Sequence, residues 1–430
     1  MIEKRSLNFF GNKTKLFLIF FTGIILYNFI IVNNFSFFAA DNITYTYHIV
    51  DFSLSLCTKL LPGAIFNFFF KNVMPWHVTL IETILLFMVF AVVSYFMAEL
   101  VCSLENMKNQ KAMLIFSLFL FTGPVTFSTF TLELGMLDVY WLYFSLLFFL
   151  FVSNKYLYFL IPVIFILSVS IHFSSLISYI LLFSIIMLYK IAKEKNGRIL
   201  LVFMLLISVV IAVILTAFFM KNESENMTYD LNGFHKFIDS RYKMNGEPYY
   251  TYYDYSFYKV PYTGNFPFDS MSEDLLIKSN GVLPDFIINI INAFWQQVHI
   301  LLCSCKETPR NIFNIIYLLL LTSPLALFFN RFWINNIRES FKKNKLLSFS
   351  YFLMLIQLPV TAVLGCLCSP DFSRWFTHTY LIQFAFVIYL IFAEKEKTVK
   401  WISDYFSRFN SKLLFLYGLV YSTTLFIVYD

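Results

Sequence analysis

The sequence places a group of chemically competent side chains after its first long apolar segment. His48, Asp51, Ser55 and Lys59 are separated by 3, 4 and 4 residues, so a helix here would carry all four on one face. A carboxylate beside a histidine and a lysine can act as a general base while the cation binds phosphate. The same spacing is also typical of the water-facing side of an interfacial helix. Asp51 is therefore a candidate catalytic residue, and His48 and Lys59 are candidate substrate ligands.

Two short turns between apolar segments carry further candidates. Glu133 and Asp138 bracket one turn, where carboxylates are costly unless they are solvated or paired. Helix capping by Asp138 is a structural explanation for one of them, and capping or solvation remains open for Glu133. His172 ends a later apolar segment, where a lone histidine also has a structural explanation. Glu133 and His172 join Asp51 as candidate catalytic residues.

The last polar turn holds Asp371, Arg374 and His378 within eight residues, at the predicted start of a helix. Arginine offers a planar fork for phosphate or carboxylate oxygens. The alternative is an internal Asp371–Arg374 pair that anchors the turn. All three residues are candidate substrate ligands.

A long polar segment, about 221–311, contains Arg241 and Lys243, followed by seven tyrosines between positions 249 and 262. Tyrosine rings and hydroxyls suit stacking on sugar rings and hydrogen bonding to their hydroxyls. The same composition also suits a small structured cap on a helix bundle. Arg241 and Lys243 complete the candidate substrate-binding set.

The six cysteines indicate neither a metal centre nor a disulfide framework. They lie in or near apolar stretches, and Cys303/Cys305 and Cys366/Cys368 are C-x-C pairs instead of C-x-x-C pairs. Small apolar residues within helices are the simpler explanation. We predict no metal site and no cofactor.

These side chains must be positioned by helices in a membrane. Hydrophobic residues form 59% of the 430 residues and charged residues only 13%, whereas a soluble domain carries about 25% charged residues. The sequence therefore predicts an all-α, polytopic integral membrane helix bundle with about eleven transmembrane helices. The predicted spans are 14–34, 78–102, 112–131, 138–153, 157–172, 174–191, 199–220, 312–330, 347–367, 375–393 and 413–429.

The charge distribution predicts how these spans thread the bilayer. With a cytoplasmic N-terminus, the inner loops hold 21 of the 32 Lys/Arg and 7 acidic residues, and the outer segments hold 11 Lys/Arg and 17 acidic residues. This split requires that the apolar stretch 286–302 does not cross. Its polar residues recur every three or four positions, which is typical of an amphipathic helix at an interface.

The predicted organisation has three parts. An N-terminal membrane bundle, 1–220, includes an outer loop at 35–77. An outer domain, 221–311, ends in the amphipathic helix 284–302, and C-terminal membrane helices fill 312–430. We expect a multi-pass protein of a bacterial cytoplasmic (inner) membrane, with its chemistry on the outer face. A cytosolic phosphate-binding loop for nucleotide substrates is not found in the sequence.

This arrangement resembles Wzy-type O-antigen and capsule polymerases, which have a similar length, a similar number of spans and one large outer loop. The resemblance implies transfer of a growing glycan between polyprenyl-diphosphate carriers, with outer arginines, here Arg241 and Arg374 by position, binding the anionic substrates. The first outer loop also resembles that of the GT-C glycosyltransferases, which implies an acidic residue there, Asp51 or Asp41.

The resemblance implies four kinds of partner. These are a polyprenyl-diphosphate-linked glycan substrate, the lipid bilayer, and a chain-length regulator or a flippase of the same assembly system; no nucleic-acid partner is expected. Two other function classes stay open. A lipid-linked oligosaccharide flippase or other transporter should show cations along its mid-membrane helices, and a receptor or structural protein would need no clustered outer His, Asp and Arg residues.

Overall fold

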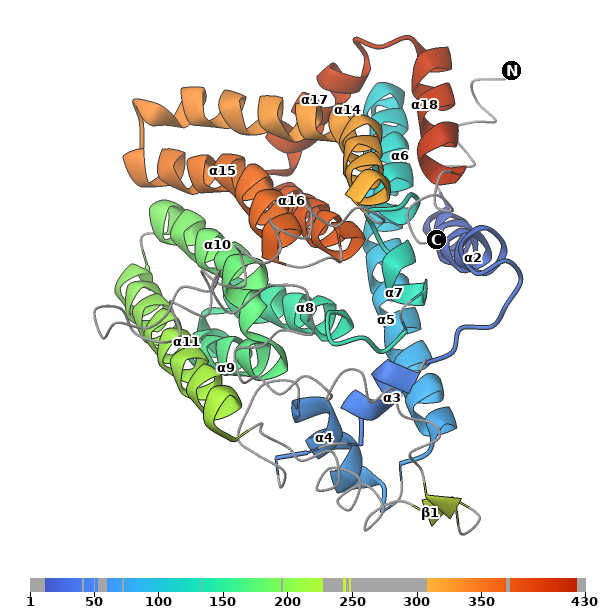
Figure 1. Cartoon of the computed structure of the whole chain (residues 1–430). Helices are drawn as coiled ribbons and strands as arrows, with labels where there is room; N and C mark the ends of the chain where they lie inside the picture. The colour runs from blue at the N-terminus through green and yellow to red at the C-terminus, as the bar shows by residue number, and fades with distance from the viewer. Residues whose placement is uncertain are drawn as a thin grey trace.

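The computed structural model describes most of the predicted membrane helices and parts of the segments between them. The described residues are 12–40, 42–49, 51–52, 60–71, 73–132, 134–194, 196–226, 243–244, 247–248, 308–368 and 372–423. They form a helix bundle with a single hairpin of two short strands, each two residues long (Figure 1).

The first half of the bundle contains α2 (Lys13–Tyr27), η1 (Asn28–Val32), α3 (Asn42–Tyr47), α4 (Leu61–Phe69), α5 (Pro75–Cys102), α6 (Met107–Phe121), α7 (Ser128–Leu132), α8 (Val139–Ser153), η2 (Lys155–Leu160), α9 (Ile161–Ile171), η3 (Phe173–Ile177), α10 (Tyr179–Lys193) and α11 (Arg198–Asn226). The remainder contains β1 (Lys243–Met244), β2 (Glu247–Pro248), α14 (Thr308–Phe341), α15 (Lys345–Cys368), α16 (Phe372–Ala393), α17 (Lys395–Phe406) and α18 (Ser411–Thr423).

Among the described residues, seven helical segments are long and apolar enough to cross a membrane. They are Lys13–Val32, Pro75–Cys102, Ser175–Lys193, Arg198–Phe219, Ile315–Phe341, Lys345–Val363 and Arg374–Ala393. Two shorter apolar helices, Val139–Ser153 and Lys155–Ile171, also match predicted spans. The class of polytopic helical membrane protein is therefore confirmed, whereas the count of eleven spans stays a prediction.

One predicted span, 112–131, is not a continuous helix. α6 ends at Phe121, and Gly123 follows with a φ of +100°, a conformation that favours glycine. Pro124 has no backbone N–H with which to continue the helical ladder. The chain then turns before the short helix α7. The prediction from apolar composition therefore overestimated the length of the helix that begins in α6.

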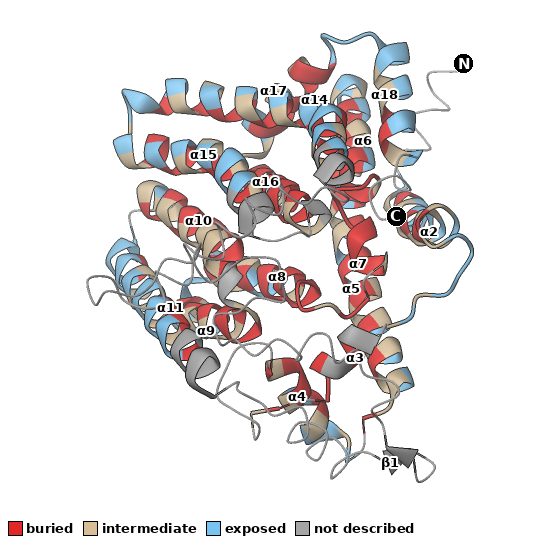
Figure 2. Cartoon of the chain, viewed as in Figure 1, coloured by how far each residue is buried: buried red, intermediate tan, exposed pale blue. Residues whose placement is uncertain are grey.

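The outward faces of the helices are apolar, as a bilayer requires. α11 shows this most clearly, because Ile199, Phe203, Leu206, Val210 and Ile214 are all exposed large hydrophobic residues on a single helix. Pale-blue residues recur along α11 and the end of α14 in Figure 2, while α8 and α16 are mostly red. α8 and α16 therefore lie inside the bundle, and α11 lies on its rim.

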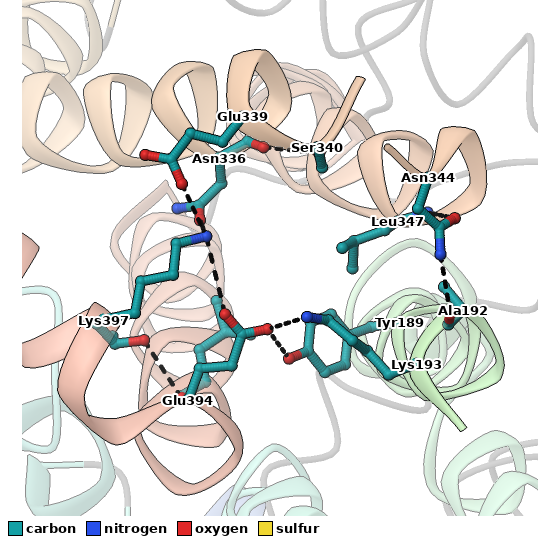
Figure 3. A network of polar contacts seen from close by, with 12 residues as sticks. Tyr189, Ala192, Lys193, Asn336, Glu339, Ser340, Asn344, Leu347, Glu394 and Lys397 are labelled. Atoms are coloured by element: carbon teal, nitrogen blue, oxygen red, sulfur yellow. Dashed lines mark hydrogen bonds and ion pairs between the residues drawn. The ribbon is translucent and has the colours of Figure 1, made fainter. Parts of the chain in front are cut away.

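Ion pairs join the helix ends on one side of the bundle. Lys13 at the start of α2 pairs with Glu99 near the end of α5, and Lys108 at the start of α6 pairs with Asp404 of α17. Figure 3 shows the next links, in which Glu394 accepts from Lys193 and Tyr189, and Lys397 pairs with Glu339. We call this side the basic end.

The basic end contains the loops that the charge argument assigned to one side of the membrane. It includes the connections α5–α6, α8–η2, α10–α11, α14–α15 and α16–α17, tied together by the ion pairs above and by a hydrogen bond from Asn344 to the Ala192 carbonyl oxygen. The turns 122–127, 134–138 and 172–178 lie at the opposite end. That the basic end faces the cytoplasm stays a prediction from the positive-inside rule.

The direction of two helices bears on the long polar segment. α11 begins at the basic end, where Gly197 lies beside Glu194 and Tyr158, and runs away from it. α14 runs back and reaches the basic end at Glu339. The end of α11 and the start of α14 therefore lie on the same side of the bundle. The amphipathic stretch 284–302 itself lies outside the described residues.

Candidate functional site

At the opposite end, two side chains of α16 contact the carboxylate of Asp138, in the turn before α8, and a tyrosine of α10 contacts one of them. From the start of α16, Arg374 donates hydrogen bonds to Asp138 Oδ2 from Nε at 2.7 Å and from a terminal nitrogen at 2.6 Å. One turn later, His378 Nε2 lies 2.9 Å from the same oxygen. Tyr179 of α10 lies 3.3 Å from His378 Nδ1 through its hydroxyl. We call these four residues the Asp138 cluster.

Burial makes the charges of the Asp138 cluster interdependent. The side chains of Asp138 and His378 are almost fully buried, while that of Arg374 is 25% exposed. Burial alone would raise the pKa of Asp138, but the Arg374 guanidinium and His378 outweigh it and hold that pKa well below its ordinary value. Asp138 is therefore an ionised anchor for a cation that still reaches the surface.

Helix capping does not explain Asp138, which corrects the structural explanation suggested by its position. Asp138 occupies the N-cap position of α8, but its backbone is helical and its side chain makes no capping hydrogen bond. Its carboxylate instead binds a residue 236 positions away. Direct ion pairing outweighs capping here because a buried carboxylate needs a charged partner.

A second buried polar group surrounds Glu82, in the first part of α5. Tyr140 of α8 donates a hydrogen bond to Glu82 Oε1 at 2.6 Å, and Tyr143 lies 3.4 Å from Oε2. His48 Nε2 lies 3.2 Å from Glu82 Oε1 and 2.8 Å from the Tyr140 hydroxyl. We call Glu82, His48, Tyr140 and Tyr143 the Glu82 cluster.

The proton positions in the Glu82 cluster are constrained by one carbonyl group. His48 Nδ1 lies 2.7 Å from the Thr44 carbonyl oxygen, which can only accept, so Nδ1 carries a proton. Nε2 lies within hydrogen-bonding distance of both the Glu82 carboxylate and the Tyr140 hydroxyl. His48 and Glu82 are both fully buried. The Glu82 cluster therefore connects the loop that carries His48 to the bundle and does not lie on the surface of the protein.

Gly135 allows the turn before α8 to approach the Glu82 cluster. Its φ is +79°, and a Cβ atom there would lie 2.7 Å from Thr44 Cγ2 and 3.0 Å from Glu82 Cγ. Only glycine fits without displacing these neighbours. The turn 134–138 thus contacts the Glu82 cluster through Gly135 and supplies the anchor of the Asp138 cluster three residues later.

The beginning of α8 joins the two clusters. Asp138 belongs to one cluster, whereas Tyr140 and Tyr143 belong to the other. Between them, Trp141 packs edge-on against the His378 ring at 5.3 Å and contacts the Tyr179 ring at 5.3 Å. A shift of α8 would therefore alter both clusters at once.

In the described part of the first loop, the helix expected from the spacing of His48 and Asp51 is not formed. α3 ends at Tyr47, and His48 lies in the following turn, so His48 and Asp51 do not share a helical face. His48 is also buried, which excludes the water-facing alternative. His48 contacts Glu82 of α5 instead, and this contact outweighs the helical preference suggested by the local spacing.

Asp51 lies in the same loop and is mostly buried. Asn67 of α4 donates hydrogen bonds to Asp51 Oδ2 at 2.8 Å and to the Ile49 carbonyl oxygen at 2.9 Å. Phe66, next to Asn67, packs against the His48 ring at 4.7 Å. α4 therefore holds the loop that carries both His48 and Asp51.

His172 follows the last residue of α9 and is half-buried. Its backbone N–H bonds to the Ser168 carbonyl oxygen at 3.3 Å, and its own carbonyl accepts from Ser175 at 3.1 Å. The convergence of Asp51, Glu133, His172 and Arg374 on one outward-opening cavity stays a prediction.

The remaining candidate residues are described only in part or not at all. Lys59, Glu133, Arg241 and Asp371 lie outside the described residues, as does the tyrosine-rich stretch 249–262. Lys243 pairs with Pro248 in the hairpin of β1 and β2. In the part of the chain that the structure describes, no group of three or more His, Cys, Asp or Glu side chains is arranged to hold a metal ion.

Four members of these clusters, namely Glu82, Tyr140, Tyr143 and Tyr179, were not among the sequence-derived candidates, and Asp138 had been assigned to helix capping. Glu82 is the one with a signal, because a carboxylate inside an apolar span is costly and calls for a partner. The three tyrosines carried no signal, since tyrosine is abundant throughout this chain. Comparisons with protein families, with curated proteins and with solved structures find no match for this chain. Its function must therefore be argued from its own residues.

Proposed function

We propose that this chain is a membrane glycosyltransferase that joins polyprenyl-diphosphate-linked oligosaccharide units, on the outer face of the membrane, during surface-polysaccharide synthesis. The observation that carries this proposal is the Asp138 cluster. It holds Arg374 at a helix start, against a buried carboxylate, while a quarter of the arginine side chain stays exposed. A cation fixed in this way is suited to neutralise a diphosphate group at the end of the bundle.

The chemistry required of such an enzyme is modest. An acceptor sugar hydroxyl attacks the anomeric carbon of the donor glycan, and the bond from that carbon to the diphosphate oxygen breaks with its electron pair leaving on the diphosphate. The hydroxyl proton passes to a base. Because diphosphate is a good leaving group, the main tasks of the protein are to orient two glycans and to stabilise the departing charge.

Asp51 is the candidate base. Its Oδ2 atom accepts a hydrogen bond from Asn67, which orients the carboxylate without adding a charge that would suppress its basicity. The loop that carries it is fixed to the bundle by His48 and the Glu82 cluster. In this proposal the Glu82 cluster positions the loop and does not touch substrate.

The transporter alternative requires cationic side chains along the middle of the spans. In the described helices α2, α10 and α16, the lysines and arginines lie in the first or last turns. Arg331 lies inside the apolar segment Ile315–Phe341 but is exposed, and the buried charge in α5 is an acid, Glu82. This distribution favours chemistry at one end of the bundle over a charged pathway through it.

The test is the glycan chain-length ladder of cells that carry the gene, its deletion or its variants. We expect deletion to remove the longer glycans. At matched protein levels, Arg374→Ala and Arg374→Lys should both shorten the ladder, because lysine keeps the charge but not the planar fork. Arg198→Ala, which removes an exposed arginine at the basic end, serves as the matched control and should leave the ladder normal.

Two outcomes would contradict the proposal at different levels. An unchanged ladder after gene deletion would exclude a polymerase. A normal ladder from Arg374→Ala in a folded protein would remove Arg374 from the site while leaving the activity to other residues. The folded fraction of each variant, measured in detergent, separates loss of chemistry from loss of structure.

A further inference from the structure

A cavity of about 740 Å³ opens at the basic end, between the last turns of α14 and the whole of α17. The two helices are held together at one side by Lys397, which pairs with Glu339 at 3.0 Å and donates a hydrogen bond to Asn336 at 3.0 Å. At the other side, the rings of Phe328 and Tyr405 approach to 5.1 Å. These contacts fix both walls of the cavity.

The cavity combines an aromatic floor with a charged rim. Phe332 and Trp401 lie 4.8 Å apart in edge-on contact, and Tyr405 stacks on Trp401 at 5.4 Å. The charged lining side chains comprise five cations and two acids, namely Arg331, Arg338, Lys397, Lys400, Arg408, Glu339 and Asp404.

Both acids are already engaged by lysines. Glu339 pairs with Lys397, and Asp404 pairs with Lys108 at 2.8 Å. The hydrogen bond from Lys108 lowers the pKa of Asp404, so this carboxylate stays ionised and paired. Among the residues that the structure describes, no ion pair is formed by the four remaining cations, Arg331, Arg338, Lys400 and Arg408.

A neighbouring cavity at the same end has a balanced charge. It has a volume of about 370 Å³ and also lies at the basic end, but its Lys190 and Lys193 are matched by Glu194 and Glu394. The two cavities therefore differ in charge balance although they share one side of the bundle.

We propose that the cavity between α14 and α17 binds a phosphate-bearing anion. Three of the four unpaired cations are arginines, whose planar forks suit phosphate oxygens. The favoured source is the headgroup of an anionic phospholipid, because α17 is amphipathic and lies at the end of the bundle, where headgroups gather. The aromatic floor then contacts the glycerol and upper acyl region. This site is independent of the proposed glycosyl transfer, which lies at the opposite end.

The test compares the thermal stability of the full-length purified protein in a neutral detergent. Short-chain phosphatidylglycerol, short-chain phosphatidylcholine and inorganic phosphate are titrated separately, and the melting temperature is followed. The test variant is Arg331→Gln/Arg408→Gln. The matched control is Arg198→Gln/Lys412→Gln, which removes two exposed cations of the same end outside the cavity.

We expect phosphatidylglycerol, and not phosphatidylcholine, to raise the melting temperature. The test variant should need at least a roughly tenfold higher concentration for the same shift, and the control should behave as wild type. If inorganic phosphate matches phosphatidylglycerol and loses its effect in the test variant, the phosphate site stands and its source is a soluble anion.

Equal responses of wild type and test variant, or an equal response to phosphatidylcholine, would overturn the proposal. The variants should fold, because they remove exposed cations that repel one another. If the double variant fails to fold, Lys400→Gln removes a third cation from α17 alone and must also weaken the response.

Discussion

The pairing of Arg374 with Asp138 can be tested by a double-mutant cycle that compares a buried pair with an exposed one. The buried pair is removed in Arg374→Gln, Asp138→Asn and the double variant. The exposed pair, Lys108 and Asp404, has a similar separation of 2.8 Å, but both side chains are about half exposed. The two cycles therefore differ mainly in solvation.

The structure sets the expected magnitudes. Removing one partner of a buried pair costs about 3–5 kcal/mol, because it leaves an uncompensated charge. Arg374 is partly exposed and His378 still contacts Asp138, so we expect about 2–3 kcal/mol for Arg374→Gln. The coupling energy of Arg374 and Asp138 should be about 2 kcal/mol, whereas exposed pairs couple by at most about 1 kcal/mol.

The assay is reversible unfolding of the purified protein in mixed micelles, with the folded fraction followed against the mole fraction of denaturing detergent. Arg374→Gln should destabilise strongly, and the double variant should recover part of that loss because the buried carboxylate is gone. A coupling energy at Asp138 and Arg374 no larger than that at Lys108 and Asp404 would refute the argument that burial makes this pair special.

Three further predictions use the same structure. Gly135→Ala should lower the stability by about 1–3 kcal/mol in the micelle assay, because it strains a left-handed residue and crowds Thr44 and Glu82. The control is Gly23→Ala in the middle of α2, whose Cβ atom would meet nothing within 4 Å, and this variant should be neutral or stabilising. Equal effects of the two substitutions would contradict the packing at Gly135. The pKa of Asp138 is depressed in the folded state, so the ionised carboxylate stabilises the fold fully when the pH is above the ordinary pKa of 3.8, and this stabilisation is lost as the pH falls below 3.8. Between pH 5 and pH 3, the free energy of unfolding should therefore fall more for wild type than for Asp138→Asn. Parallel curves would argue against an ionised anchor. Reporter fusions after residues 260, 308 and 340 should read outside, outside and inside, and an inside signal at 308 would exclude the proposed threading.

Hydropathy and charge predicted much of the fold because they act through solvent and not through specific partners. A long apolar segment must become a helix in a bilayer whichever neighbours it has. α5 ends at its predicted boundary and α11 begins within one residue of its predicted start for this reason, although α11 continues six residues beyond the predicted end. The loops that the charge argument assigned to one side of the membrane do lie together at the basic end, where ion pairs connect the helices that flank them.

Local pattern failed where a tertiary partner decided the outcome. The spacing of His48 and Asp51 suggested one helical face, yet His48 leaves α3 to reach Glu82, 34 residues away. Asp138 resembled a helix cap, yet it binds Arg374 across 236 residues. Sequence spacing reports neighbours three or four positions apart and carries no information on these contacts. Gly123 and Pro124, which follow the end of α6, are a sequence signal for a helix end. The prediction from hydropathy continued the span past them because the surrounding residues are apolar.

The two clusters have different exposure, and this difference assigns them different roles. Burying a charged group costs several kcal/mol, and well-packed apolar residues would often stabilise the bundle as well or better. The Glu82 cluster is closed, since His48 and Glu82 have no exposed surface, so it can act on a substrate only by fixing the loop that carries Asp51. The Asp138 cluster is open at Arg374, so it can meet an anion directly. Variants of the Glu82 cluster should therefore alter activity only as far as they move that loop, whereas Arg374 should affect substrate binding even when the fold is intact.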